Sequence, residues 1–254
     1  MEPLRKPYQG ITNIIKFNRH LYLLSAGMVL ILMILTRFIT GPYLLLNYII
    51  ITLVIAGILI SLVVSFYIYD LSGFYKLNWL NELPIIAGDK IVNINAGFDE
   101  TSQLLLQRYL AAELIVFDFY DPLKHTEVSI KRARKAYLPF SGTIETSTSA
   151  LPLENNSARY IFLIFAAHEI RKEQERDDFF KELKRILKPG GKIILVEHLR
   201  DIPNFLAYNM GFFHFVSRLC WQHTFSNSGL SIQKEIKITP FISNFILEKD
   251  GSTT

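Results

Sequence analysis

The 254-residue sequence contains a single cysteine, Cys220, so no disulfide can form within the chain. This shortage favours a reducing compartment. The sequence also lacks the HExxH and paired CxxC spacings of metal sites, the GxSxG elbow and the P-loop. We therefore predict no metal ion. The net charge of +4 is small and dispersed, which argues against a nucleic-acid partner and leaves an anionic membrane surface as the milder interpretation.

Apolar residues, by contrast, make up half of the chain, and two long runs carry much of this excess. The runs are "LYLLSAGMVLILMILT" (21–36) and "YLLLNYIIITLVIAGILISLVVSFYIY" (43–69). The second can cross a hydrocarbon core of about 30 Å at about 1.5 Å per residue. Gly41-Pro42 breaks the helix between the runs. A cleaved signal peptide is the alternative for the first run, but no clear small-x-small site follows it. We therefore predict a transmembrane helical hairpin over 21–69.

Basic residues set the expected orientation of this hairpin. The segment 1–20 carries several of them, whereas the turn between the spans carries only Arg37; those before the first span are Arg5, Lys6, Lys16 and Arg19. By the positive-inside rule both ends of the hairpin face the cytoplasm. We predict a two-span protein of the inner or cytoplasmic membrane whose remaining residues face the cytoplasm.

A short linker, 70–87, joins the hairpin to the rest of the chain. Its aromatic residues Phe74, Tyr75 and Trp79 suit the headgroup region of a bilayer, so an interfacial linker is expected.

Residues 88–254 alternate between β-rich apolar runs and amphipathic helical segments. Strands separated by helices imply crossover connections and a parallel sheet. We therefore predict an α/β domain with a Rossmann-like, seven-stranded, mostly parallel sheet whose last two strands form an antiparallel pair at an edge. The expected strands are 90–94, 113–119, 142–148, 159–167, 192–198, 230–239 and 241–249, and the expected helices are 101–111, 123–137 and 177–188.

Three stretches of this domain resemble the class I S-adenosylmethionine-dependent methyltransferases, in the broad group that includes the quinone-biosynthesis enzymes. They are "LIVFDF" (114–119), "ALPLENNSARYIFLIFAAHEI" (150–170) and "FFKELKRILKPGGKIILVEH" (179–198). The resemblance covers about 88–249. It implies the class I methyltransferase fold, S-adenosyl-L-methionine as cofactor, and a ligand site beyond the carboxyl ends of the strands.

The resemblance assigns the nucleoside half of the cofactor to two strand ends. Asp118 would accept hydrogen bonds from the ribose diol, although a helix cap or a surface acid is the alternative. Phe119 would contact the adenine face or belong to the core. The adenine edge would lie against Ser149, Ala150 and Leu151, where Ser147 and its neighbours replace the family's usual acid.

The loop "INAGFDET" (94–101) would hold the methionine half, but it departs from the family pattern. Asn93 replaces an acid, Asn95 and Asp99 replace the outer two of three glycines, and Ala96 and Gly97 lie between them. Asn95 tolerates a positive φ and so would preserve the turn. Asp99 would cap the following helix. We predict an altered cofactor site that still binds its ligand.

Candidate catalytic groups follow the fourth and fifth strands. His168, in "AAHEIR", is the first candidate for a base because its ordinary pKa lies near neutral, and His198 lies on the same rim. A helix cap or a salt bridge is the alternative for each. The aromatic connection 200–229 would line an acceptor pocket, lie on the bilayer, or cover the sheet as an ordinary helix.

These observations favour a membrane-anchored S-adenosylmethionine-dependent methyltransferase. An anchor has little use for a soluble substrate, so its expected partners are a lipophilic small-molecule or lipid acceptor and the membrane lipids themselves. The alternative is a non-catalytic, methyltransferase-like membrane scaffold or partner-binding protein with a degenerate cofactor loop.

Overall fold

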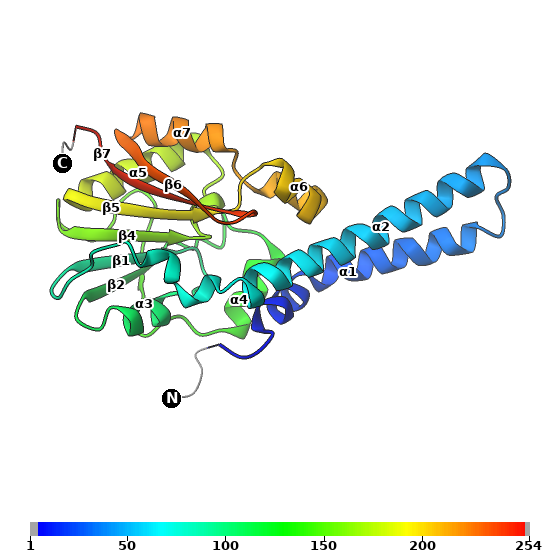
Figure 1. Cartoon of the computed structure of the whole chain (residues 1–254), viewed down its shortest axis with the longest axis horizontal. Helices are drawn as coiled ribbons and strands as arrows, with labels where there is room; N and C mark the ends of the chain where they lie inside the picture. The colour runs from blue at the N-terminus through cyan, green and yellow to red at the C-terminus, as the bar shows by residue number, and fades with distance from the viewer. Residues whose placement is uncertain (1–4, 252–254) are drawn as a thin grey trace.

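The computed structural model describes residues 5–251; the outer ends of the predicted N-terminal segment and domain, 1–4 and 252–254, lie outside the described residues. Two long helices, α1 (Gln9–Leu35) and α2 (Pro42–Phe66), form a hairpin that projects from an α/β domain (Figure 1). Both helices are long and apolar enough to cross a membrane. α1 begins at Gln9, well before the apolar run at Leu21. Pro42 occupies the first turn of α2, where its missing N–H costs no helical hydrogen bond.

The domain contains the expected seven-stranded sheet, in the order β3-β2-β1-β4-β5-β7-β6. All neighbouring pairs from β3 to β5 are parallel, whereas β7 is antiparallel to both β5 and β6. The edge pair predicted from the sequence is therefore confirmed. The strands are β1 (Lys90–Asn95), β2 (Glu113–Asp118), β3 (Ile144–Glu145), β4 (Ala158–Ile164), β5 (Leu187–Glu197), β6 (Leu230–Thr239) and β7 (Ile242–Lys249).

Three strands differ from their predicted bounds by more than one residue. β4 ends at Ile164, three residues before its predicted end. β3 has only two residues, because the chain turns away from β2 directly after Glu145. β5 begins at Leu187, which pairs with Ala158, and its register against β4 shifts before Lys192 pairs with Tyr160. The Pro189-Gly190-Gly191 turn therefore lies within β5 as an irregularity and does not separate it from the preceding helix.

Helices cover both faces of the sheet. α5 is amphipathic, and its apolar face of Phe179, Phe180, Leu183 and Ile186 is fully buried, as predicted. The helices of the domain are α3 (Ser102–Arg108), α4 (Val128–Ala136), α5 (Glu173–Ile186), α6 (Ile202–Tyr208) and α7 (Arg218–Asn227), with the short turns η1 (Tyr67–Leu71), η2 (Phe74–Lys76), η3 (Asn78–Leu80), η4 (Ala167–Glu169) and η5 (Asn209–His214).

The two faces have separate cores. α5 and α7 pack on one face, where Trp221 and Phe225 are buried. α3 and the linker pack on the other, and here Phe74 is 1 % exposed and stacks on Trp79 at 5.6 Å. The headgroup role predicted for Phe74 is therefore wrong, because its ring completes the second core.

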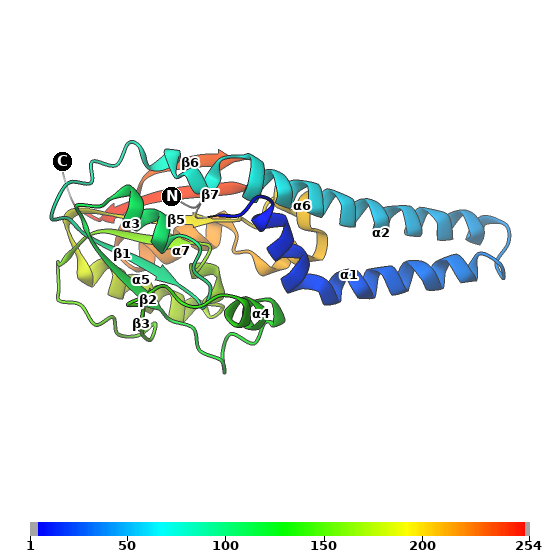
Figure 2. The same cartoon turned by 90° about the horizontal axis from the view of Figure 1, so that it is seen from below.

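The hairpin meets the domain at the carboxyl edge of the parallel strands (Figures 1 and 2). Phe98, shortly after β1, contacts Phe17 of α1, and His198, directly after β5, contacts Tyr69 of η1. α6 lies beside the base of α2. The hairpin thus adjoins the edge of the sheet at which ligands bind in open α/β folds.

Candidate functional site

The loop after β1 is built on a single glycine. Gly97 has a φ of +94°, and a β-carbon there would lie 2.8 Å from the ring of Tyr120. Its N–H donates to Asn95 Oδ1 at 3.2 Å. Gly97 therefore takes the positive φ that was predicted for Asn95. Asp99 Oδ1 accepts from the N–H groups of Thr101 and Ser102, both at 2.9 Å. The N-cap residue of α3 is Thr101 and not the predicted Asp99, which fixes the turn before the helix from two residues ahead of the N-cap.

Polar atoms of this loop are buried without a partner among residues 5–251. They are Asn93 Oδ1, Asn95 Nδ2 and Asp99 Oδ2. The other half of each side chain is fixed; for example, Asn93 Nδ2 donates to Thr101 Oγ1 at 3.0 Å and Ser102 Oγ at 2.7 Å. A buried polar group without a partner costs about 1–3 kcal/mol, so the loop presents three oriented groups that a polar ligand would satisfy.

The start of α1 covers the outer side of the same loop. Phe98 packs edge-on against Phe17 with ring centroids 5.6 Å apart. Glu100 accepts hydrogen bonds from Arg5 at 2.6 Å and from Tyr75 at 2.7 Å, and Asn13 donates to it at 3.3 Å. Residues from the hairpin and the linker therefore fix the position of the loop.

The acid at the end of β2 is already paired. Asp118 Oδ2 lies 2.5 Å from Arg134 Nη1, and Asp118 Oδ1 accepts from the N–H of Tyr120 at 2.9 Å. The Arg134 guanidinium lies 4.4 Å from the centroid of the Tyr120 ring. Asp118 thus occupies the predicted position, with an arginine from α4 as its partner.

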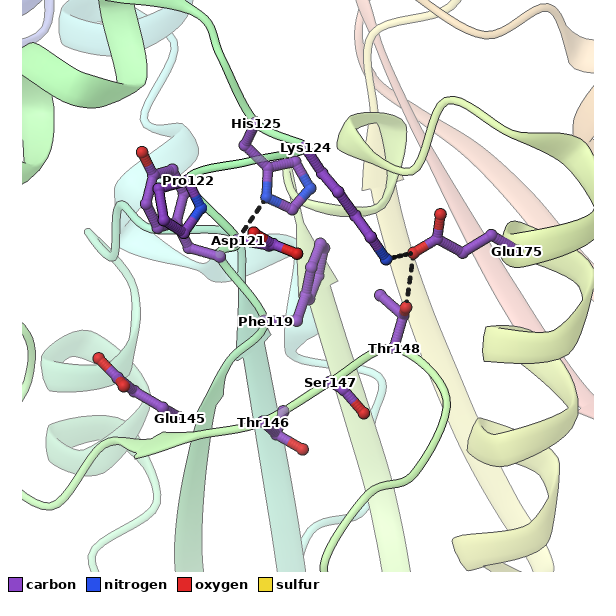
Figure 3. A pocket seen from close by; sticks show the side chains of 11 residues that line it. Phe119, Asp121, Pro122, Lys124, His125, Glu145, Thr146, Ser147, Thr148 and Glu175 are labelled. Carbon is purple, nitrogen blue, oxygen red and sulfur yellow. Dashed lines mark hydrogen bonds and ion pairs between the residues drawn. The ribbon is translucent and has the colours of Figure 1, made fainter.

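A cavity of about 460 Å³ opens beside these residues, between the segments that follow β2 and β3 (Figure 3). Phe119 lies in its wall and also packs on Phe179 of the core. Glu175 reaches in from α5, where its carboxylate accepts from Lys124 at 2.6 Å and Thr148 at 2.7 Å. The size of this cavity falls in the range of small-molecule sites.

The residues predicted to hold the adenine edge lie next to this cavity and do not line it. Ser149 and Ala150 are exposed, whereas Leu151 is buried in the core and donates its N–H to Glu182 at 3.2 Å. The lining residues of this strand end are instead Thr146, Ser147 and Thr148. The shift arises because β3 ends at Glu145, three residues before its predicted end.

His168 lies in η4 and is tied to the end of β5. Its backbone N–H donates to Glu197 Oε1 at 3.1 Å, and its ring Nδ1 lies 2.7 Å from Glu197 Oε2. Burial alone would lower the pKa of His168, but the carboxylates of Glu197 and Glu169 outweigh it and raise the pKa to about 10. His168 therefore carries a proton at neutral pH, which argues against its predicted role as a base.

His198 has the opposite character. Burial lowers its pKa to about 4, so the imidazole is neutral at physiological pH. Its Nδ1 lies 3.0 Å from the carbonyl oxygen of Phe241, which makes Nδ1 the donor and Nε2 the acceptor for the Tyr69 hydroxyl at 2.9 Å. The ring stacks on Phe165 at 4.9 Å, and Phe165 has a positive φ of +54°. Backbone strain of this kind costs about 1–3 kcal/mol and concentrates at functional sites.

Several residues of the site have no local sequence signal. Phe17, Tyr69, Arg134 and His214 reach it from elements far away in the chain, and no spacing rule connects them to the strand ends. Glu197 and Glu169 could be found from the sequence, because each is the neighbour of a candidate catalytic histidine near a predicted strand end.

The comparisons with known proteins agree with this geometry. Residues 93–195 match the family model of a methyltransferase domain. A solved Haloferax volcanii complex of the Trm112 methyltransferase activator with a methyltransferase is similar to this chain, with a TM-score of 0.51 and 15% identity over 72% of this chain and 92% of that one. A solved protein from Pyrococcus horikoshii is similar with a TM-score of 0.51 and 15% identity, over 69% of this chain and 87% of that one. A Leishmania major S-adenosylmethionine-dependent methyltransferase is similar with a TM-score of 0.50 and 15% identity, over 74% of this chain and 77% of that one. No curated protein matches the sequence.

At these identities the solved structures establish the class I methyltransferase fold. Residues 93–195 are similar to a methyltransferase domain, and S-adenosylmethionine is the cofactor that these findings support.

The residues present fit this cofactor. The cavity beside Phe119 would take the adenine, Asp118 would face the ribose, and the unpartnered atoms of Asn93, Asn95 and Asp99 would face the methionine end. The cationic amino group of that end suits Asp99 Oδ2 and Asn93 Oδ1, which are acceptors. When bound, the cofactor supplies an electrophilic methyl group.

Proposed function

We propose that this chain is a membrane-anchored S-adenosylmethionine-dependent methyltransferase that transfers a methyl group to a lipophilic small molecule or lipid, such as a quinone precursor, on the cytoplasmic side of the membrane. The observation that carries the proposal is the contact between the hairpin and the carboxyl edge of the sheet. Phe17 packs on Phe98 of the cofactor loop, and Tyr69 binds His198.

The surface next to this contact supports an acceptor that arrives from lipid. The hairpin exposes apolar side chains along its length, including Leu23 and Leu24, each 70 % exposed. Beside the base of α2, the segment α6–η5 exposes Ile202, Leu206 and Met210. An apolar surface of this kind is typical of a segment that lies in a membrane interface.

A basic helix lies on the same side of the domain. Arg132 of α4 donates to the carbonyl oxygen of Phe17 at 2.6 Å, so α4 lies against α1. Lys131 and Lys135 of this helix are exposed. Lysines close to a cytoplasmic leaflet attract anionic lipids, which supports the proposed orientation.

The chain's own residues suggest how an acceptor would be handled. Methyl transfer requires alignment of the acceptor atom with the sulfonium, plus a proton acceptor where a hydroxyl reacts. Neutral His198 holds its Nε2 lone pair toward the Tyr69 hydroxyl, so this pair is the candidate route for the proton.

The test is methyl transfer by the full chain in detergent or lipid vesicles. Labelled S-adenosylmethionine should pass its methyl group to an organic-extractable product when a membrane lipid extract is supplied, and water-soluble acceptors should remain unlabelled. Tyr69→Phe should reduce transfer without loss of cofactor affinity. Label confined to water-soluble products would contradict the lipophilic acceptor.

A second candidate, the non-catalytic scaffold, is favoured by one observation. Arg134 forms an ion pair with Asp118, and the ring of Tyr120 fills the space beside Gly97. A methyltransferase needs room for its cofactor at both places. Calorimetry with S-adenosylmethionine and S-adenosylhomocysteine separates the two candidates. Binding of neither by the folded chain would establish the scaffold.

The orientation has its own test. A reporter fused to the C-terminus should be active only in the cytoplasm, and a signal from the opposite side of the membrane would overturn the cytoplasmic placement.

A further inference from the structure

A cluster of nitrogen and carboxylate ligands lies where β4 and β5 end. His168 and Glu169 belong to η4, and His214 is the last residue of η5. One potential ligand atom from each lies within 4.8 Å of the other two. His168 Nε2 is 3.3 Å and His214 Nε2 is 3.4 Å from the same oxygen, Glu169 Oε1.

Each histidine is oriented by a second carboxylate on its other nitrogen. His168 Nδ1 lies 2.7 Å from Glu197 Oε2, and His214 Nδ1 lies 2.6 Å from Glu127 Oε1. Both Nε2 atoms therefore face Glu169. Nδ1 of His168 has Glu197 as its partner, whereas Nδ1 of His214 has both Glu127 and the Arg171 guanidinium beside it. Metal-binding histidines are usually fixed by this carboxylate–histidine arrangement, which sets the tautomer and raises the basicity of the ligating nitrogen.

The charges of the cluster leave room for a cation. The guanidinium of Arg171 pairs with Glu127 and Glu169, whereas Glu197 pairs with His168. The three carboxylates thus outnumber the guanidinium by two, and the proton on His168 offsets one of these charges until a metal ion replaces it. Arg171 also contacts the ring and the backbone oxygen of His214, so its guanidinium is the group that a bound ion would displace from His214 Nε2.

We infer that His168, Glu169 and His214 form a binding site for a first-row divalent metal ion such as Zn²⁺. Two imidazoles and one carboxylate are a ligand set of zinc and of non-haem iron, whereas Mg²⁺ and Ca²⁺ take oxygen ligands. The ion takes the place of the proton on His168 Nε2, because metal ligands bind in their deprotonated form. The absence of a metal-binding spacing in the sequence is no obstacle, because His168 and His214 meet only in the fold.

The position of the site suggests a use for the metal, and this part rests on the proposed function. The cluster adjoins Phe215, which stacks on His198 at 5.0 Å, so it shares the rim at which the acceptor would bind. A divalent ion with open positions binds an oxygen of the acceptor and lowers its pKa. The substrate class is then a lipophilic hydroxyl compound or one with a ligating oxygen.

The binding test uses the untagged full chain in detergent, stripped with a chelator and titrated with Co²⁺, whose visible absorption reports its ligands. One equivalent should bind with an absorption band, and Zn²⁺ should displace it. His214→Ala and Glu169→Gln should abolish this binding. Glu127→Gln should weaken it about 10–100-fold, as loss of an orienting partner does.

The matched control is His223→Ala, which removes an exposed histidine of α7 outside the cluster. It should bind Co²⁺ as the unaltered chain does. The thermal midpoint of each variant reports whether it folds, and His214 lies near the surface, so His214→Ala is expected to fold. Absence of a stoichiometric band in the unaltered chain, or a band unchanged in folded His214→Ala, would overturn the site.

A second arm separates the metal from the methyltransferase. The stripped chain should bind S-adenosylmethionine with unchanged affinity but lose methyl transfer, and Zn²⁺ should restore the transfer. Full transfer by the stripped chain would overturn the catalytic use of the metal. If the chain binds Co²⁺ at this cluster but does not bind S-adenosylmethionine, the proposed function fails and the metal site stands.

Discussion

Arg134 Nη1 lies 2.5 Å from Asp118 Oδ2, so an arginine of α4 pairs with the acid that ends β2. The same guanidinium lies over the ring of Tyr120, and that ring closes the space next to Gly97. The nucleoside half of the cofactor site is thus linked to the methionine half through two side chains. Ribose hydroxyls would compete with Arg134 for the same carboxylate oxygen.

This competition predicts that Arg134→Ala tightens S-adenosylmethionine binding. The arginine of this ion pair is partly exposed. Loss of the pair should therefore make the free energy of cofactor binding more favourable by about 1 kcal/mol, which is about fivefold in affinity. Calorimetry on the detergent-solubilised chain measures the change. Lys135→Ala, an exposed position on the same helix, is the control and should leave the affinity unchanged. Weaker binding by Arg134→Ala would show that the arginine supports the cofactor.

Removal of the acid should have the opposite effect. Asp118→Ala loses the charged acceptor of the ribose diol, and a hydrogen bond to a charged group is worth about 1.5–3 kcal/mol, so the affinity should fall about 10–100-fold. Asp118→Asn keeps an oxygen that can accept from the Tyr120 N–H and should lose less. Equal affinities in the unaltered chain and Asp118→Ala would mean that the ribose site lies elsewhere.

Burial patterns explain which parts of the fold could be predicted. The apolar face of α5 and the β-rich runs follow directly from the periods of helix and strand, so the sheet and its antiparallel edge were accessible from the sequence. The positions of Asp118 and Asp99 could be predicted too, because they lie at a strand end and before a helix, where the chemistry is local. The positive φ of the loop was instead predicted at Asn95, whereas the structure has it at Gly97.

Contacts between distant segments could not be predicted from the sequence. Phe74 reads equally well as an interfacial or a core aromatic, and only the packing of the linker on the sheet decides between the two. His168 and His214 are joined by no periodicity, and Phe17 lies in a segment predicted to precede the domain. The early end of β3 likewise depends on how the chain leaves the edge of the sheet. Because of it, the cavity is lined by Thr146 and its neighbours and not by the predicted Ser149.

The contact of α1 with the loop after β1 predicts that the hairpin affects cofactor binding. Phe17→Ala removes an aromatic pair worth about 0.5–1.5 kcal/mol and loosens Phe98, so S-adenosylmethionine affinity should fall a few-fold. Phe38→Ala, at the tip of the hairpin and 78 % exposed, is the matched control and should have no effect. If both variants bind the cofactor as the unaltered chain does, α1 does not hold the loop in its binding conformation.

Burial of His198 makes the stability of the domain depend on pH. In the unfolded chain this imidazole takes up a proton near pH 6.5, whereas in the folded chain its pKa is lowered to about 4 by burial. Between these values the unfolded state binds more protons, so the free energy of unfolding falls as the pH falls from 6.5 to 4. A shift of this size corresponds to about 3 kcal/mol by pH 4, and the whole of the His198 contribution is present above pH 6.5.

His198→Phe removes this titration while it keeps a ring between Phe165 and Phe215. The variant loses the hydrogen bonds to Tyr69 and to the Phe241 carbonyl, so it should be less stable at pH 7 than the unaltered chain. Its thermal midpoint should nevertheless fall less steeply between pH 6.5 and 4. The measurement is a series of thermal melts of both chains in detergent across this range, with His223→Ala as the exposed-histidine control. Parallel curves for His198→Phe and the unaltered chain would show that His198 is not held neutral by the fold.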